Sequence, residues 1–324
     1  MLSRRSVLKG TATAALAAGT VAMLPELSFA KAPLQSFQAP GFYRLKLGDI
    51  EITALSDGTI PLPLETLYTH TTEEKARAAL AAALKPSPTQ TSINAYLVNT
   101  GERLVLIDAG TGAYLGPSLG KLAANLAASG YRAEDIDDIL LTHIHTDHSG
   151  GLAVDGKRVF PNATVRVNKR DLDFWMDAAA AEKATGALKS QFKEAQESLK
   201  PYLDAGKVEA FGDNAEAVPG IGTILRAGHT PGHSSMVVES GGQKLVFWGD
   251  VTHGDVLQFD EPGVAIEFDI DQDKAIEARA AAFTEAADQA YLVAGAHIAF
   301  PGIGHVRRDE TNYDWVPLNY SGAL

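Results

Sequence analysis

Alternating and continuous apolar segments along the chain predict two blocks of β-strands. Residues 42–58 alternate between apolar and polar side chains, which is typical of strands with one buried face. Denser apolar segments predict further strands at residues 93–100, 103–110, 137–143, 235–240, 243–250 and 290–297. The first block therefore ends near residue 143, and the second begins near residue 235.

Helical periodicity lies between and after these strands. Residues 71–84 are predicted to form a helix, because Thr71 and Glu74 have the spacing of a capping box. Three leucines, at positions 119, 122 and 126, share one helical face, and a second face carries Ile276, Ala280, Phe283 and Ala287. Residues 170–181 and 188–203 are predicted to form two more helices, joined by residues 182–187. The pattern indicates an α/β chain with helices outside its sheets.

The first 30 residues are predicted to be a signal peptide of the twin-arginine type. Arg4 and Arg5 precede a small, apolar segment, and Ala30 closes a stretch with the small residues of a cleavage site. A membrane anchor is the alternative, but the apolar segment is shorter than the roughly 20 residues that a span needs. We expect a periplasmic or secreted protein, with residues 31–324 forming a single catalytic domain and no stable membrane insertion after cleavage.

Composition narrows the classes of partner and metal site. The formal charge is −12, and it becomes −14 when residues 1–30 are removed, so nucleic acid is not an expected partner. The chain has no cysteine, which excludes disulfides and thiolate ligands. Any metal must therefore be bound through nitrogen and oxygen.

The densest cluster of potential metal ligands is the segment THIHTDHSGG, residues 142–151, directly after a predicted strand. His143 and His145 alternate by two, so in extended backbone they point to the same side. Asp147 and His148 follow and can face a second point nearby. Imidazole and carboxylate together suit zinc and similar ions. Exposed loop histidines with a helix-capping aspartate are the alternative.

Three further ligand-type residues follow other predicted strands or loops. Asp250 and His297 each come directly after an apolar strand, and His233 lies in the segment GHTPGH. We assign His229, in the same segment, a structural role. Asp108, at the end of another strand, is a candidate for orienting a ligand histidine, or else a turn residue ahead of Gly110.

These motifs resemble the metallo-β-lactamase superfamily, with its HxHxDH pattern and three downstream ligands. The likeness extends over residues 41–322 and is strongest to the methyl parathion hydrolase branch, through segments such as LGDIEITALSDGT, GHTPGH and AFPGIGH. The resemblance implies a four-layer αββα sandwich. It also implies that one metal is bound by His143, His145 and His233, the other by Asp147, His148 and His297, and that Asp250 bridges them.

The resemblance further implies a hydrolase with two divalent ions, expected to be zinc, that uses a bridging hydroxide on a small-molecule substrate. Asp147 and Asp250 are the candidate catalytic carboxylates. Lactones or carboxylic esters are the expected substrates, with phosphotriesters as a side activity. A dedicated organophosphate hydrolase and a non-catalytic periplasmic metal-binding protein are the alternatives, and a homodimer is left open.

Six side chains are candidates for the substrate pocket: Tyr96, Leu115, Trp175, Phe192, His253 and Phe268. The resemblance suggests Trp175 and Phe192, on the two helices after the histidine cluster, and Tyr96, although all three also fit a hydrophobic core. The chain departs from the branch at Leu115, His253, Phe268 and Gln191. These departures make the expected leaving-group pocket less aromatic and add an imidazole near the metals.

Overall fold

The computed structural model describes residues 32 and 34–324, so the predicted signal peptide lies outside the described residues. Contacts group residues 39–324 into one unit, and every element below belongs to it. Within the described residues, no helix combines the length and the apolar character that a membrane crossing requires.

Two seven-stranded sheets form the centre of this unit. The first has the spatial order β1 (Phe42–Leu47), β2 (Ile50–Leu62), β4 (Thr89–Asn99), β5 (Leu104–Ile107), β6 (Asp138–Leu140), β9 (Thr164–Asn168) and β10 (Val208–Phe211). The second has the order β11 (Glu216–Val218), β12 (Ile221–Leu225), β13 (Ser234–Ser240), β14 (Gln243–Gly249), β16 (Leu292–Gly295), β17 (Ile303–Asp309) and β18 (Asn312–Pro317). The short pairs are β3 (Tyr68–Thr69) with β15 (Ala265–Ile266) and β7 (Ala153–Val154) with β8 (Lys157–Arg158).

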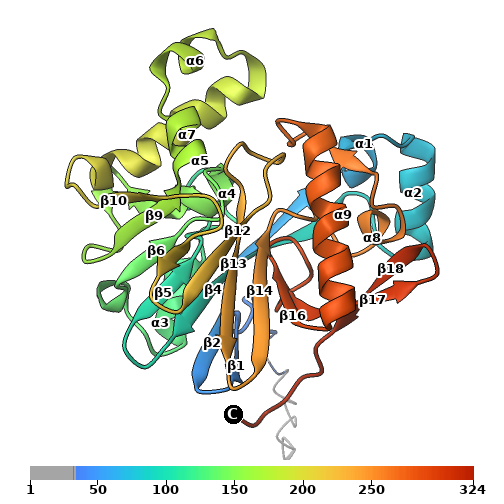
Figure 1. The fold of residues 1–324 in the computed structure, drawn as a ribbon, viewed down its shortest axis with the longest axis horizontal. Coiled ribbons are helices and arrows are strands. Elements are labelled where there is room, and N and C mark those ends of the chain that lie inside the picture. Colours follow the sequence, from blue (N-terminus) through green and yellow to red (C-terminus); the bar gives the residue numbers. More distant parts are fainter. Residues whose placement is uncertain (1–31, 33) are drawn as a thin grey trace, which may run out of the picture. The chain divides into compact units, whose positions relative to one another are not determined.

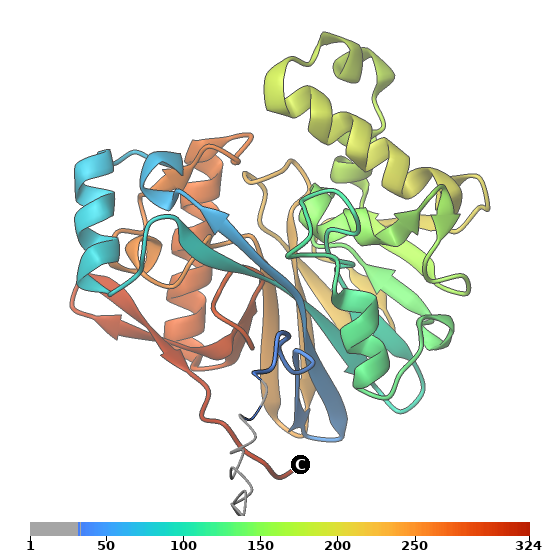
Figure 2. The same ribbon diagram turned by 180° about the vertical axis from the view of Figure 1, so that it is seen from behind.

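Helices cover the outer face of each sheet, as Figure 1 shows for α7 and α9 on opposite sides. The α-helices are α1 (Leu64–Leu67), α2 (Glu73–Ala82), α3 (Leu122–Ala128), α4 (Thr146–Ser149), α5 (Lys169–Trp175), α6 (Ala178–Lys183), α7 (Gly186–Leu203), α8 (Leu257–Asp260) and α9 (Gln272–Gln289). The 3₁₀ turns are Ala133–Asp135 and Gly150–Leu152. Figure 2 shows α3 from behind, where it packs on β1 and β2.

Alternation along the strands explains how the layers are held together. In β14, Leu245 and Phe247 face the core between the sheets, while Val246 and Trp248 face the core under α9. A strand buried on both faces needs a continuous apolar sequence, which is why its segment has no polar alternation. The first sheet has the same arrangement, with a third core between its outer face and α3, α5 and α7. The predicted αββα sandwich is confirmed.

Several helix boundaries differ from the prediction. Leu119 lies before α3, which begins at Leu122, and α7 begins at Gly186. The N-cap of α2 is Thr72, whose hydroxyl accepts from the Lys75 backbone amide, so Thr71 is not the cap. The helix predicted over residues 170–181 is two helices, α5 and α6. Asp177 caps the second by accepting from the amides of Ala179 and Ala180, and this new N-terminus interrupts the helical pattern.

Parallel pairing brings the polar ends of several strands to one edge of the sandwich. β5 and β6 are parallel in the first sheet, and β14 and β16 are parallel in the second. Each of these strands is followed, within three positions of its end, by a polar residue: Asp108, His143, Asp250 and His297. Because carboxyl ends of parallel strands meet at one edge, residues far apart in sequence become neighbours.

Asp57 fastens the loop after β5 to β2 beneath this edge. Its buried carboxylate accepts from the Thr111 amide at 3.0 Å and the Thr111 hydroxyl at 2.7 Å. It also accepts from the amides of Gly120 at 3.1 Å and Leu122 at 2.9 Å. One carboxylate therefore organises the segment from residue 111 to the start of α3.

We predict that Asp57→Asn lowers the free energy of unfolding by about 3 kcal/mol, because an amide nitrogen would face donors and leave buried groups unpaired. The control is Asp49→Asn, at an exposed side chain, with an expected change within about 0.5 kcal/mol. Urea denaturation of the metal-free protein measures both. Equal stability of the two variants would contradict the role assigned to Asp57.

Candidate metal centre

The histidine cluster leaves β6 in an extended conformation and then enters α4. His145 is the N-cap of α4, with φ −96° and ψ 162°, so His143 and His145 project to the same side before the chain turns. Both side chains are buried. Asp147, in the first turn of α4, and His148 then face a neighbouring point.

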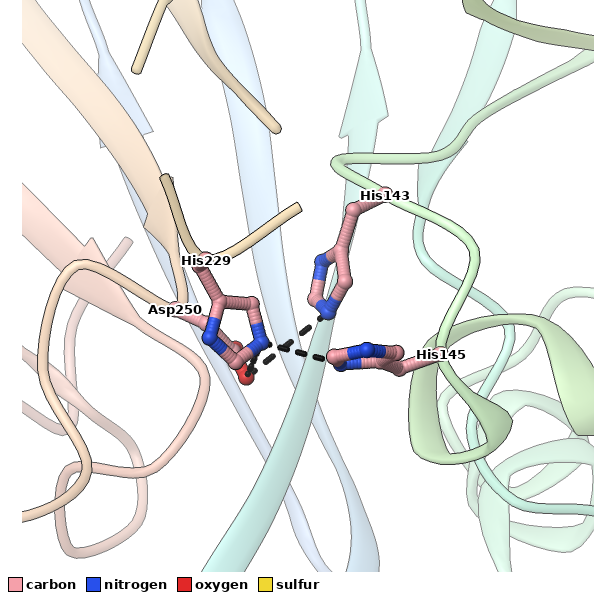
Figure 3. A group of neighbouring side chains, drawn as sticks. All are labelled: His143, His145, His229 and Asp250. Atoms are coloured by element: carbon pink, nitrogen blue, oxygen red, sulfur yellow. Dashed lines mark hydrogen bonds and ion pairs between the residues drawn. The ribbon is translucent and has the colours of Figure 1, made fainter. Parts of the chain in front are cut away.

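The first group of donor atoms consists of His143, His145, His229 and Asp250, drawn in Figure 3. One potential ligand atom from each lies within 4.8 Å of all the others. His229 Nε2 is 2.9 Å from His145 Nδ1 and 3.1 Å from Asp250 Oδ2. His143 Nε2 is 3.8 Å from the same carboxylate oxygen. These four side chains point to one centre.

The prediction placed His233 in this group and gave His229 a structural role, and the structure reverses that assignment. His233 Nδ1 lies 3.1 Å from the Arg226 carbonyl oxygen, to which it donates, and His233 Nε2 accepts from the Asp250 backbone amide at 3.0 Å. Burial lowers the pKa of His233 to about 3, so the ring is neutral and can accept this bond. With both nitrogens engaged by backbone, His233 has no lone pair for a metal.

The second group consists of Asp147, His148 and His297, again with ligand atoms within 4.8 Å of one another. Asp147 Oδ2 is 3.4 Å from His297 Nε2 and 3.6 Å from His148 Nε2. Asp250 joins the two groups, because its Oδ1 is 3.1 Å from His148 Nε2 and its Oδ2 is 3.1 Å from His297 Nε2. The predicted bridging position of Asp250 agrees with this geometry.

The chemistry of these donors fits divalent cations. His143 Nε2, His148 Nε2 and Asp250 Oδ1 are buried, and no residue in the described part of the chain is their hydrogen-bond partner. His148 Nε2 and Asp250 Oδ1 are nevertheless only 3.1 Å apart. Two ligands on one ion at about 2.1 Å lie roughly 3.0–3.4 Å from each other. A cation between them would satisfy atoms that otherwise have no partner.

Hydrogen bonds behind the donors fix their orientation. Asp108 accepts from His148 Nδ1 at 2.8 Å, so the proposed orienting role of Asp108 has a contact that supports it. Asp269 accepts from His229 Nδ1 at 2.8 Å, and the Ser92 carbonyl oxygen lies 3.0 Å from His297 Nδ1. These partners keep the proton on the outer nitrogen and turn Nε2 toward the centre. The sequence prediction missed Asp269, which belongs to no motif.

Asp171 connects the two loops that carry the first group. It is buried at the start of α5, and its carboxylate accepts from the Ile144 amide at 2.9 Å and the Gly232 amide at 2.6 Å. Burial raises the pKa of the Asp171 carboxyl. Ile144 lies between two donors of the histidine loop, and Gly232 lies in the loop of His229. One side chain therefore fixes both loops to each other.

A cavity of about 380 Å³ opens onto the donors. Its apolar lining comes from Ile60, Leu62, Ile93, Leu115, Ala187 and Phe268, and its polar lining outside the donors comes from Thr146, Ser190, Gln191 and Glu194. Among the predicted pocket residues, Leu115, His253 and Phe268 line it, as does Gln191.

Tyr96, Trp175 and Phe192 do not line this cavity, and their assignment to the pocket is wrong. Tyr96 lies between the sheets and donates to the Gly295 carbonyl at 2.9 Å. Trp175 and Phe192 pack together in the core under α5 and α7, with ring centroids 5.0 Å apart. Trp175 reaches the centre indirectly, because its ring packs edge-on against His145 at 5.4 Å.

Comparisons with known proteins agree with this geometry. A family model described as the metallo-beta-lactamase superfamily matches residues 88–297. A solved hydrolase, AbOPH, described as in the beta lactamase superfamily, is 37% identical with a TM-score of 0.84, over 88% of this chain and 100% of that one. A dizinc quorum-quenching lactonase, AidC, solved with the product N-hexanoyl-L-homoserine, is 30% identical with a TM-score of 0.80, over 87% and 99% of the two chains.

Curated relatives include an N-acyl homoserine lactonase of Bacillus cereus, 28% identical over 126 residues. That alignment spans 39% of this chain and 42% of the relative. A lactonase of a Bacillus species is 31% identical over 34% of this chain and 36% of its own length. The matched segments therefore span less than half of these two relatives.

We predict opposite effects for the two histidines of the GHTPGH segment. His229→Ala removes a donor and should lower metal affinity at least about 100-fold. His233→Ala removes two bonds to backbone and should lower the unfolding free energy of the metal-free protein by about 2 kcal/mol, with metal affinity within about tenfold of the original. Competition with a chelator and urea denaturation measure the two effects. The reverse pattern would restore His233 as the ligand.

We also predict that metal affinity rises with pH. Burial disfavours the His229 imidazolium, but the carboxylates of Asp250 and Asp269 outweigh it and raise the pKa of His229 to about 9 in the metal-free protein. His229 is therefore protonated at pH 7 and must lose its proton to bind a metal. Apparent affinity should rise about tenfold per pH unit for each proton released, up to about pH 9.

The matched variant for this prediction is Asp269→Asn. Removing that carboxylate lowers the pKa of His229, so the rise in affinity should level off at a lower pH than in the original protein. Metal titrations at several pH values provide the measurement. A pH-independent affinity would contradict the prediction.

Proposed function

The chain belongs to the metallo-beta-lactamase superfamily as a metallo-hydrolase, and from this premise we propose that it is a dinuclear enzyme that opens lactones carrying an apolar acyl chain. Zinc is the first candidate for both ions. The observation that carries the proposal is the position of Asp250, which joins two groups of donors at the floor of a mostly apolar cavity.

The division of the donors into two groups supports a site for two ions. His143, His145 and His229 would hold one ion, Asp147, His148 and His297 the other, and Asp250 would contact both. When bound, such ions supply a nucleophile from water near neutral pH and stabilise negative charge on the substrate oxygen. Asp108 and Asp269 keep His148 and His229 oriented, so the donors need no rearrangement.

The side chains around the cavity would hold the substrate against this centre. Leu62, Leu115 and Phe268 offer apolar surface to an alkyl chain and exclude water. Asp147 lies on the cavity side of the donors with part of its carboxylate exposed, which supports a role in moving a proton to or from the substrate. A volume of about 380 Å³ suits a small organic molecule.

The cavity lining favours an aliphatic acyl group over an aryl leaving group. Among the described residues that line the cavity, Phe268 is the only phenylalanine, tyrosine or tryptophan. The remaining apolar wall is aliphatic. AidC is described with N-hexanoyl-L-homoserine, and the Bacillus relatives are described as N-acyl homoserine lactonases. N-acyl homoserine lactones are therefore our first choice of substrate. Export by the twin-arginine route and a homodimer remain predictions.

The test is a substrate panel for the metal-loaded protein: N-acyl homoserine lactones of increasing chain length, dihydrocoumarin and methyl paraoxon. Each added methylene that is buried contributes about 0.8 kcal/mol, so kcat/KM should rise up to about fourfold per carbon until the cavity is full. His145→Ala should abolish turnover. Phe268→Ala should weaken the dependence on chain length, because it removes apolar wall and no donor.

Methyl paraoxon hydrolysis that exceeds every lactone rate would favour the alternative, a dedicated phosphotriester hydrolase. Metal uptake without turnover of any substrate on the panel would favour a metal-binding protein. Either result would overturn the proposal.

A further inference from the structure

An additional imidazole, that of His253, lies among the donors and belongs to neither predicted group. Its side chain is buried, and its Nε2 is 3.1 Å from Asp250 Oδ2. His253, Asp250 and His297 have ligand atoms within 4.8 Å of one another. The His253 imidazole therefore lies as close to Asp250 and His297 as the predicted ligands lie to one another.

His253 and His297 have the same distance to Asp250. The Nε2 atoms of both rings are 3.1 Å from the same oxygen, Asp250 Oδ2. The rings are stacked, with centroids 5.2 Å apart and planes 17° apart. A separation of 3.1 Å falls in the range of roughly 3.0–3.4 Å for two ligands on one ion. The distance to Asp250 and the ring orientation of His297 thus recur at His253.

The backbone of His253 is fixed from both sides. Its amide donates to Gln258 Oε1 at 2.7 Å, and its carbonyl accepts from the Tyr68 hydroxyl at 2.8 Å. Gln258 is itself buried and donates to the Val264 carbonyl at 3.0 Å. The imidazole is therefore presented to Asp250 by a rigid segment.

The outer nitrogen of His253 has no hydrogen-bond partner among the described residues. Its Nδ1 is buried without a hydrogen bond, whereas His148 and His229 donate from Nδ1 to carboxylates. No outer bond fixes the ring, so its orientation depends on the interaction at Nε2 and on its packing against the His297 ring.

We propose that His253 is a direct ligand of the ion that His297 and Asp250 bind. The structure groups His253 with Asp250 and His297. Added to Asp147 and His148, which we assign to the same ion under the proposed function, His253 would bring its protein donors to five. Zinc takes four ligands in structural sites, whereas manganese and cobalt accept more. His253 therefore shifts this position toward ions that take five or six ligands. The proposal concerns the metal centre and is independent of the substrate.

The test uses the metal-free full chain, titrated with cobalt and in parallel with zinc. His253→Ala removes the imidazole, and His253→Gln keeps a side chain that can donate to Asp250 but is a poor ligand. Both variants should lower the affinity for one of two bound cobalt ions at least about tenfold. Both should strengthen the visible absorption of cobalt, because bands intensify as the coordination number falls. The loss should be larger for cobalt than for zinc.

Phe268→Leu is the matched control. Phe268 packs beside His253, with ring centroids 6.0 Å apart, and has no donor atom, so its affinity and spectrum should match the original protein. Unchanged affinity and spectrum in His253→Ala would overturn the proposal. Recovery of both properties in His253→Gln would also overturn it, because a hydrogen bond to Asp250 would then be sufficient. Neither readout requires turnover, so a failed lactone assay leaves this result intact.

Discussion

The arrangement of the centre follows from one buried carboxylate, that of Asp250. Its charge lies among imidazoles at 3.1 Å from several directions, and these neighbours keep its pKa well below the usual range although burial opposes this. Asp147, Asp108 and Asp269 add three carboxylates on or directly behind the donors. Four carboxylates thus lie on or behind the imidazoles, and bound divalent cations would offset their negative charge. The charge of the centre therefore agrees with its donor geometry in suiting divalent cations.

The fold brings these carboxylates and imidazoles together by aligning strand ends from both sheets. β5 and β6 bring Asp108 and the histidine loop, while β14 and β16 bring Asp250 and His297. The loops are then fixed by buried polar contacts instead of by regular structure. Asp171 joins the loops of Ile144 and Gly232, and His233 joins the end of β12 to the amide of Asp250. The precision of the centre thus depends on side chains that contact no ion.

Much of the fold could be predicted from the sequence, because buried strands such as β4 and β14 are continuously apolar and the helices between them are periodic. Strands β9 to β12 were missed, since they are three to five residues long and partly exposed. Strands β17 and β18 were missed as well, and most residues of β18 are not buried. The ligand-type residues of the histidine loop were visible as a cluster. The choice between His229 and His233 was not, because it depends on the distant Arg226 carbonyl and the Asp250 amide. Trp175 and Phe192 were ambiguous for a similar reason, since an aromatic residue on a helix fits a core or a cavity until its packing partners are known.

The cavity wall and the donors come from separate parts of the chain. The wall is assembled from β2, β4, the loop at Leu115, α7 and the residue Phe268, while the donors leave the ends of β6, β14 and β16 and the loop of His229. Selection can consequently act on the wall alone. Replacing one or two wall side chains would redirect the enzyme to a new substrate while its hydrolytic machinery is inherited unchanged, which gives such a scaffold an accessible evolutionary route between substrates.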